Sequence, residues 1–190
     1  MTEISGVIEE SKLKGADEKE YVWYASYGSN MLYERFTYYI KGGYYEVNNK
    51  PYPGCRDKTP PKDDRSITIP FRMYFGNQSP SWGNGGVSFL DLNTPGKSLG
   101  RMYLVTREQF DDIQDQEGMH ENWYNEICEF GECDGCKILT FTNKSKRTVC
   151  MPSDRYLDVV KSGISETYKD MSDVEIVGYL VDCGVIMGSR

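Results

Sequence analysis

The chain has 190 residues, enough for one domain with a substantial core and short for two. Its 22 basic and 29 acidic residues give a net charge of −7, which argues against a nucleic-acid or anionic-membrane partner, because both require a basic surface. No apolar run approaches the roughly 18 residues that indicate a membrane-spanning helix.

Residues 1–20 are charged and lack the apolar centre of a signal peptide. We therefore expect a flexible N-terminal tail, a single domain over residues 21–190 and a cytoplasmic location. The six cysteines are spread along the chain and do not form a dense disulfide framework.

The first predicted elements are a strand and a helix. Residues 21–26 are aromatic and β-branched, which is typical of a buried strand. Residues 31–36 suit a helix, with Leu32 and Phe36 one turn apart on one face.

The four residues between them are Tyr27-Gly28-Ser29-Asn30, called the 27–30 turn below. Gly28 is expected to adopt backbone angles that a side chain would forbid, and Ser29 or Asn30 to cap the helix. Such a turn collects backbone N–H groups in front of the positive end of a helix dipole, and so predicts a site for a carboxylate or a developing oxyanion. An ordinary strand-to-helix connection is the alternative.

A stretch rich in glycine and proline, residues 42–65, is expected to form an inserted loop rather than a packed element. A lid over a site and a plain surface loop both fit it. Four tyrosines just before this stretch and at its start are expected to be exposed and to suit a homodimer contact: Tyr38, Tyr39, Tyr44 and Tyr45.

The middle of the chain is dominated by predicted strands. Residues 66–75 form a strand with a break or bulge at Pro70, and residues 86–92 and 99–105 form a hairpin that turns at 93–97. Three further strands are expected at 123–130, 137–142 and 146–151.

Helices are predicted around these strands. Thr106 and Gln109 form a capping box for a helix that ends at Gly118. Another helix opens at residues 152–153, and Ser172 with Glu175 caps a last one. Strands in the middle with helices at the edges indicate an α+β domain with a mixed or barrel-like sheet.

Cys133 and Cys136 form a CxxC pair, and Cys128 and Cys150 are the nearby candidates for a second pair. A small zinc or redox site is one interpretation, and unreactive thiols around a turn is the other. The sequence favours the second, because it has no second CxxC and no histidine close by.

The acidic residues of the 106–117 helix differ in their setting. Asp111, Asp112 and Asp115 are expected on its solvated face, whereas Glu117 lies at the helix end beside Gly118. On its own this makes Glu117 a weak candidate for acid–base chemistry.

The 27–30 turn, the segment Asp115-Gln116-Glu117-Gly118 and then Tyr124 resemble, in order and rough spacing, the γ-glutamylcyclotransferase family. Residues 152–157, which open a helix, are similar to its C-terminal part, so the resemblance covers about residues 23–163. The insertion and the hairpin around Cys133 depart from the family pattern, and both concern substrate specificity.

The resemblance implies a small mixed β-barrel core with flanking helices, no metal and no cofactor. It also implies conversion of a γ-glutamyl amide into 5-oxoproline and a free amine. The 27–30 turn would hold the glutamyl group of this small-molecule substrate, and Glu117 would handle the proton.

These roles are physically reasonable. The substrate's α-amine attacks its own γ-carbonyl, so the site need only hold a reactive conformer. Glu117 would take the ammonium proton and then protonate the leaving nitrogen. Because an ordinary Glu, with a pKa of about 4.3, is a poor base, we expect burial beside Trp123 and Tyr124 to raise its pKa. Tyr124 would orient Glu117 or the substrate, or else be a core tyrosine.

Three other functions remain open. Ser29 with His120 as base would make a hydrolase, although the 27–30 turn is not GxSxG. A non-catalytic module could bind an amino acid or peptide in the same cavity. An interaction protein could use residues 38–52. The leaving group cannot be read from the sequence.

Overall fold

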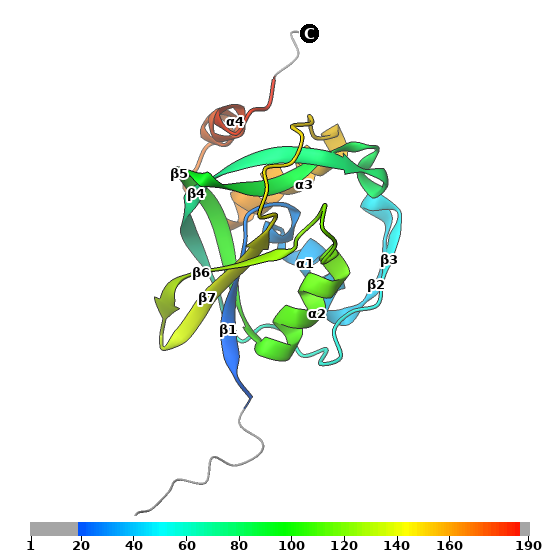
Figure 1. Cartoon of the computed structure of the whole chain (residues 1–190), viewed down its shortest axis with the longest axis vertical. Coiled ribbons are helices and arrows are strands. Elements are labelled where there is room, and N and C mark those ends of the chain that lie inside the picture. The colour runs from blue at the N-terminus through cyan, green and yellow to red at the C-terminus, as the bar shows by residue number, and fades with distance from the viewer. Residues whose placement is uncertain (1–18, 187–190) are drawn as a thin grey trace, which may run out of the picture.

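The computed structural model describes residues 19–186, so nearly all of the expected N-terminal tail lies outside the described residues (Figure 1). In this range no helix has both the length and the apolar character needed to cross a membrane.

A five-stranded mixed sheet forms the centre of the fold, in the order β4-β5-β1-β7-β6. β1 lies in the middle, antiparallel to β5 and parallel to β7, and its residues from Val22 to Ser26 are buried. The strands are β1 (Tyr21–Ser26), β4 (Asp64–Ser79), β5 (Gly85–Thr106), β6 (Glu126–Cys133) and β7 (Cys136–Thr142).

Four helices surround this sheet: α1 (Tyr33–Lys41), α2 (Arg107–Glu117), α3 (Asp154–Thr167) and α4 (Asp173–Asp182). α2 packs against α1 and β1, and α3 packs against β5, which curves with β4 across the top of the view in Figure 1. The expected α+β class is confirmed. The sheet is not closed into a barrel, because β4 and β6 form its two edges.

The predicted hairpin at residues 86–92 and 99–105 is wrong. Residues 85–106 form one strand, β5, which pairs with β4 over most of its length. The register jumps from Arg72 opposite Asp91 to Phe71 opposite Pro95, so the residues expected to reverse the chain instead make a bulge that bends the strand. A similar register shift confirms the bulge expected at Pro70.

Two of the three later strands are confirmed, as β6 and β7, although β6 begins at Glu126 rather than at residue 123. The strand expected at 146–151 is wrong. This segment makes only one isolated bridge, from Val149 to Gly76 of β4, because it follows the edge of the sheet too briefly to build a ladder.

The helix caps are mostly confirmed. Thr106 with Gln109 and Ser172 with Glu175 form the expected capping boxes, and the Ser153 hydroxyl caps α3. The predicted cap of the first helix is wrong.

A 3-10 helix (Ser29–Met31) precedes α1, and Leu32 is the N-cap, with no side-chain hydrogen bond. Asn30 does not cap α1: its Nδ2 donates to Tyr24 and Glu117 inside the protein, and its Oδ1, the atom that would accept from the helix, is buried without a hydrogen-bond partner.

The insertion is more ordered than expected. It contains β2 (Gly43–Tyr45), a 3-10 helix (Glu46–Asn48) and β3 (Lys50–Tyr52), which form a small two-stranded sheet. The sequence reading missed this element because its two strands are only three residues long.

The tyrosines of this region, which were expected to be exposed, are mostly buried. Tyr39, Tyr45 and Tyr52 are buried, Tyr38 is partly buried, and Tyr44 is the one that is largely exposed.

Candidate functional site

A cavity of about 460 Å³ lies where the 27–30 turn, α1, β3, the end of α2 and α3 meet. Its volume is in the range of small-molecule sites. All the residues predicted for the site line it: Tyr27, Gly28, Ser29, Asn30, Glu117 and Tyr124. The structure therefore brings together residues that are almost 100 positions apart in the chain.

Gly28 leaves the space that the side chains of the cavity wall occupy. Its φ is −124°, outside the left-handed region. A Cβ at this position would lie 2.8 Å from both the Ser88 Oγ and the Tyr156 hydroxyl oxygen. Any side chain there would push the turn away from the cavity wall.

We expected the 27–30 turn to lead directly into the first helix. The turn does not lie at the start of α1. Its carbonyls accept from the next turn, with Gly28 bonded to Met31 and Ser29 to Leu32. The backbone N–H of Tyr33, where α1 begins, donates to Glu166 instead. Within the described residues, the N–H groups of Gly28 and Asn30 donate to no protein group, and both residues line the cavity.

Glu117 is the last residue of α2 and lies partly buried at the cavity wall. Its Oε1 accepts from the Asn30 amide at 3.0 Å. Burial raises the pKa of Glu117, as expected. The charge of Arg35, the nearby Tyr39 hydroxyl and the hydrogen bond from Asn30 act in the opposite direction on that pKa but do not cancel the effect of burial.

Tyr124 does not bond to Glu117. Its hydroxyl donates to the Ser88 carbonyl at 2.9 Å, and its ring stacks on Phe89 with the centroids 4.8 Å apart. Tyr124 therefore forms part of the cavity wall and does not orient Glu117 through a hydrogen bond, while its expected contact with the substrate stays a prediction.

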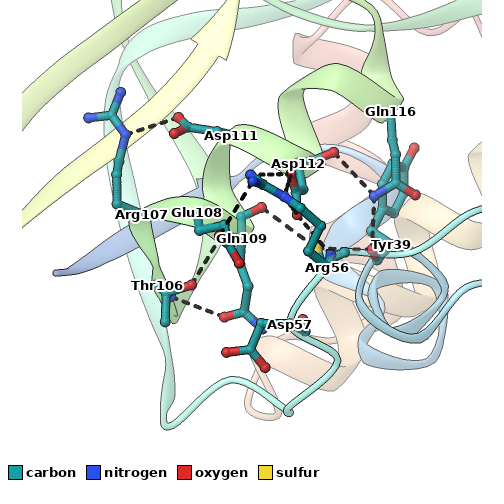
Figure 2. Close-up of polar contacts among 11 residues, drawn as sticks. Tyr39, Arg56, Asp57, Thr106, Arg107, Glu108, Gln109, Asp111, Asp112 and Gln116 are labelled. Atoms are coloured by element: carbon teal, nitrogen blue, oxygen red, sulfur yellow. Dashed lines mark hydrogen bonds and ion pairs between the residues drawn. The ribbon is translucent and has the colours of Figure 1, made fainter. Parts of the chain in front are cut away.

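Glu117 is the last residue of α2, and Figure 2 shows polar contacts that hold this helix. Arg56 pairs with Asp112 at 2.9 Å, and the Gln116 amide donates to the Tyr39 carbonyl at 2.9 Å. Asp112 is thus not simply a solvated carboxylate. These contacts tie α2 to the insertion and to α1, and fix the helix end that carries Glu117.

Sequence reasoning missed Arg35, Tyr39, Lys50 and Tyr52, which also line the cavity. The available signal was the spacing on α1. Arg35 lies four residues before Tyr39 and three after Leu32, so a charged residue falls on the apolar face of the helix.

His120 is exposed at the edge of the cavity, and no hydrogen bond joins it to Ser29 in the described part of the chain. The structure gives no support to a Ser–His pair here.

Over residues 19–186, no cluster of three or more His, Cys, Asp or Glu side chains is arranged to hold a metal ion. The six cysteines are unpaired thiols, and Cys133 faces Cys136 across the end of the β6–β7 hairpin.

Comparison with solved structures identifies the fold. A gamma-glutamyl cyclotransferase aligns with a TM-score of 0.60 and 15% identity, over 90% of this chain and 91% of that one. The chain has the gamma-glutamyl cyclotransferase fold. An uncharacterized human protein (loc79017) aligns with a TM-score of 0.60 and 18% identity, over 90% and 92% of the two chains. YkqA from Bacillus subtilis aligns at 0.58 and 16% identity, over 90% of this chain and 57% of that one.

These structural alignments show the gamma-glutamyl cyclotransferase fold, and at 15–18% identity they do not show the activity. No protein-family model matches the chain. Among curated proteins, histone deacetylase 5 of Arabidopsis thaliana is 43% identical over 99 residues. That match spans 50% of this chain but only 15% of the length of the deacetylase.

Proposed function

We propose that the protein is an enzyme of the γ-glutamylcyclotransferase type, which cyclises a γ-glutamyl group to 5-oxoproline and releases an amine or amino acid. The observation that carries this proposal is the bond between Glu117 and Asn30: a carboxylate with a raised pKa is joined at 3.0 Å to the turn predicted to hold the substrate.

In the proposed reaction the α-amine nitrogen attacks the γ-carbonyl carbon and a new C–N bond closes the five-membered ring. Glu117 accepts the proton that the nitrogen loses. The N–H groups of Gly28 and Asn30 are the donors for the oxyanion that forms on the carbonyl oxygen. The Glu117 proton then passes to the leaving nitrogen as the original amide bond breaks.

The charges around the cavity suit this substrate. A γ-glutamyl group carries both an ammonium and a carboxylate, and the cavity is lined by acidic Glu117 and Asp115 and by basic Arg35 and Lys50. The proposed reaction needs no cofactor. The six unpaired cysteines agree with the reducing conditions of the cytoplasm, where we place it.

The test is 5-oxoproline release, measured by mass spectrometry, from a panel of γ-glutamyl amino acids and γ-glutamyl amines. We expect wild type to turn over at least one of them and Glu117→Gln to be slower by about 10²- to 10⁴-fold, the usual contribution of acid–base catalysis. Asp111→Asn is the matched control, because Asp111 lies on the same helix and pairs with Arg107 outside the cavity.

Three outcomes are informative. Equal activity of Glu117→Gln and wild type would remove Glu117 from the mechanism. No turnover, but protection of the protein from thermal unfolding by panel members, would favour a non-catalytic binding module. The best substrate would identify the leaving group.

A further inference from the structure

Cys133 and Cys136 lie at the tip of the β6–β7 hairpin, which projects from the sheet at the left of Figure 1. Neither residue lines the cavity described above. The two face one another directly in the register of the antiparallel strands. Between them Asp134 and Gly135 form a two-residue turn in which both have positive φ, 51° and 75°. Such a turn matches the twist of a tight hairpin, so the backbone itself fixes the pairing of the two cysteines.

This pairing brings the two thiols close to the geometry of a disulfide. Residues directly opposite in an antiparallel pair have Cα atoms about 4.5–5.5 Å apart, and a disulfide spans about 4.4–6.8 Å. The Cβ atoms of such pairs, about 4.5–5.5 Å apart, must approach by up to about 1 Å. The tip has room for this adjustment, because no atom lies within 4 Å of the Cβ positions of Gly131 and Gly135.

A small reagent can reach both thiols. Cys133 and Cys136 are partly exposed, and the two turn residues between them are exposed. Three other cysteines differ, because burial raises the pKa of Cys55 to about 12 and the pKa values of Cys128 and Cys183 to about 11. Since the thiolate is the form that attacks a disulfide, these three thiols react poorly near pH 7.

Cys128 and Cys150, the sequence-based candidates for a second pair, do not join this site. Cys128 faces Thr140 of β7, and the Cys150 thiol points to the Asn84 carbonyl, 3.9 Å from its Sγ. Within the described part of the chain, no third His, Cys, Asp or Glu completes a cluster that could hold a metal ion. The geometry therefore supports a bond between two thiols rather than a zinc site.

Cys133 is held to the main sheet by Arg65 of β4 and Trp23 of β1. The Arg65 Nη1 donates to the Cys133 Sγ at 3.5 Å, and its Nη2 pairs with Asp134 of the turn at 2.8 Å. The guanidinium lies over the Trp23 ring, 4.9 Å from its centre. The Trp23 indole in turn donates to the Cys133 carbonyl at 3.0 Å. Both the side chain and the backbone of Cys133 are thus fixed opposite Cys136.

We propose that Cys133 and Cys136 are a reversible redox modification site, at which the two thiols form an intramolecular disulfide by exchange with a low-molecular-weight disulfide. One cysteine thiolate attacks a sulfur of that disulfide, forms a mixed disulfide and releases the first small thiolate. The other cysteine thiolate then attacks the protein sulfur of the mixed disulfide and releases the second. The protein loses two hydrogens, and the small disulfide is reduced to two thiols.

The test exposes the full chain to increasing ratios of 2-hydroxyethyl disulfide to 2-mercaptoethanol. This probe contains no γ-glutamyl group, so the result does not depend on the proposed function. After an acid quench, all free thiols are alkylated in urea and the intact mass is measured. We expect two fewer of the six thiols to be alkylated, with no mercaptoethanol added, and full alkylation again when the ratio is lowered.

Peptide mapping locates the bond. Protease cleavage after Glu129 and Glu132 separates Cys128 from the pair, so a bond within the pair and a bond to Cys128 give different fragments. We expect the bond to join Cys133 and Cys136. The far-ultraviolet circular dichroism of the oxidised protein should equal that of the reduced protein, because the register already places the two residues opposite each other.

Two variants serve as controls. In Cys136→Ser the remaining thiol has no partner, so the reaction should stop at the mixed disulfide, detected as the mass of one added mercaptoethanol. Cys128→Ser is the matched control, because Cys128 lies on the same strand but faces Thr140. This variant should form the same bond as wild type at the same ratio of disulfide to thiol.

Several results would overturn the proposal. Mixed disulfides at Cys133 or Cys136 of wild type without closure of the bond would show that the two thiols do not meet. No reaction at any ratio, or a bond to Cys128, would also refute it. Loss of the far-ultraviolet signal on oxidation would show that the bond does not belong to the folded protein. A bond that 2-mercaptoethanol does not reopen would contradict its reversibility.

Discussion

At the scale of single residues, the candidate site depends on a balance around one carboxylate. Burial disfavours the ionised form of Glu117, while Arg35, Tyr39 and Asn30 favour it. The net effect is a pKa above the ordinary value, which suits a group that must first take a proton and later return it.

This balance predicts a pH-dependent cost of folding. The folded pKa of Glu117 is raised, so the folded protein binds this proton more tightly than the unfolded chain does. The contribution of protonated Glu117 to the stability is therefore fully present below the ordinary glutamate pKa near 4.5, and it is lost as pH rises through the pKa of Glu117 in the folded protein.

We expect Glu117→Gln to be more stable than wild type at neutral pH, by about 1.4 kcal/mol for each unit by which the pKa is raised. The gain should vanish as pH falls below about 4.5. Urea unfolding between about pH 4 and pH 8 measures it, with Asp111→Asn as control. A difference in stability between Glu117→Gln and wild type that does not grow from acid to neutral pH would contradict the expectation.

At the scale of elements, the 27–30 turn is placed by its contacts with other parts of the chain. The Tyr103 hydroxyl of β5 donates to the Asn30 carbonyl at 2.7 Å, and Arg101 donates to the Met31 carbonyl. α3 presses against the same segment at Gly163, where a Cβ would lie 2.6 Å from the Leu32 nitrogen.

This close approach predicts opposite effects for two glycines in helices. Gly163→Ala would force backbone atoms apart, so we expect a loss of about 1–3 kcal/mol and a displaced 27–30 turn, with lower kcat/KM. Gly178 of α4 has no atom within 4 Å of its Cβ position, so Gly178→Ala should gain about 0.5–1 kcal/mol. The midpoints of urea unfolding measure the stabilities of the two variants against wild type. Equal stabilities of the two variants would contradict the proposed packing role of Gly163.

At the scale of the whole molecule, one hydrophobic cluster joins the main sheet to the insertion. It contains Trp23 of β1 as well as Tyr45, Tyr52 and Trp82 beside the cavity. Because these side chains share one core, we propose that the described chain behaves as a single domain.

The prediction is one cooperative unfolding transition. Far-ultraviolet circular dichroism, which follows the sheet and helices, and tryptophan fluorescence, which includes Trp82 beside the β2–β3 sheet, should give the same midpoint. An earlier fluorescence transition would mean that the insertion unfolds on its own.

Local signals in the sequence determined most helices, and together with the family resemblance they predicted most of the candidate site. Helix caps at Thr106, Ser153 and Ser172 depend on residues three positions apart, so they can be read directly. The 27–30 turn and Glu117 lie at recognisable junctions, a strand before a helix and the end of a helix before a glycine, but these junctions alone made them weak candidates. The resemblance to the γ-glutamylcyclotransferase family singled them out.

Only the tertiary structure decided the features that depend on distant partners. The 93–97 segment continues β5 because β4 lies beside it, although its residues are those of a turn. Tyr124 bonds to Ser88 and not to Glu117, and Arg35 meets Tyr52 across 17 residues. Hydrogen bonds and burial between residues far apart in the chain leave no local pattern, so neither the bend of the sheet nor the surroundings of Glu117 could be read from the sequence.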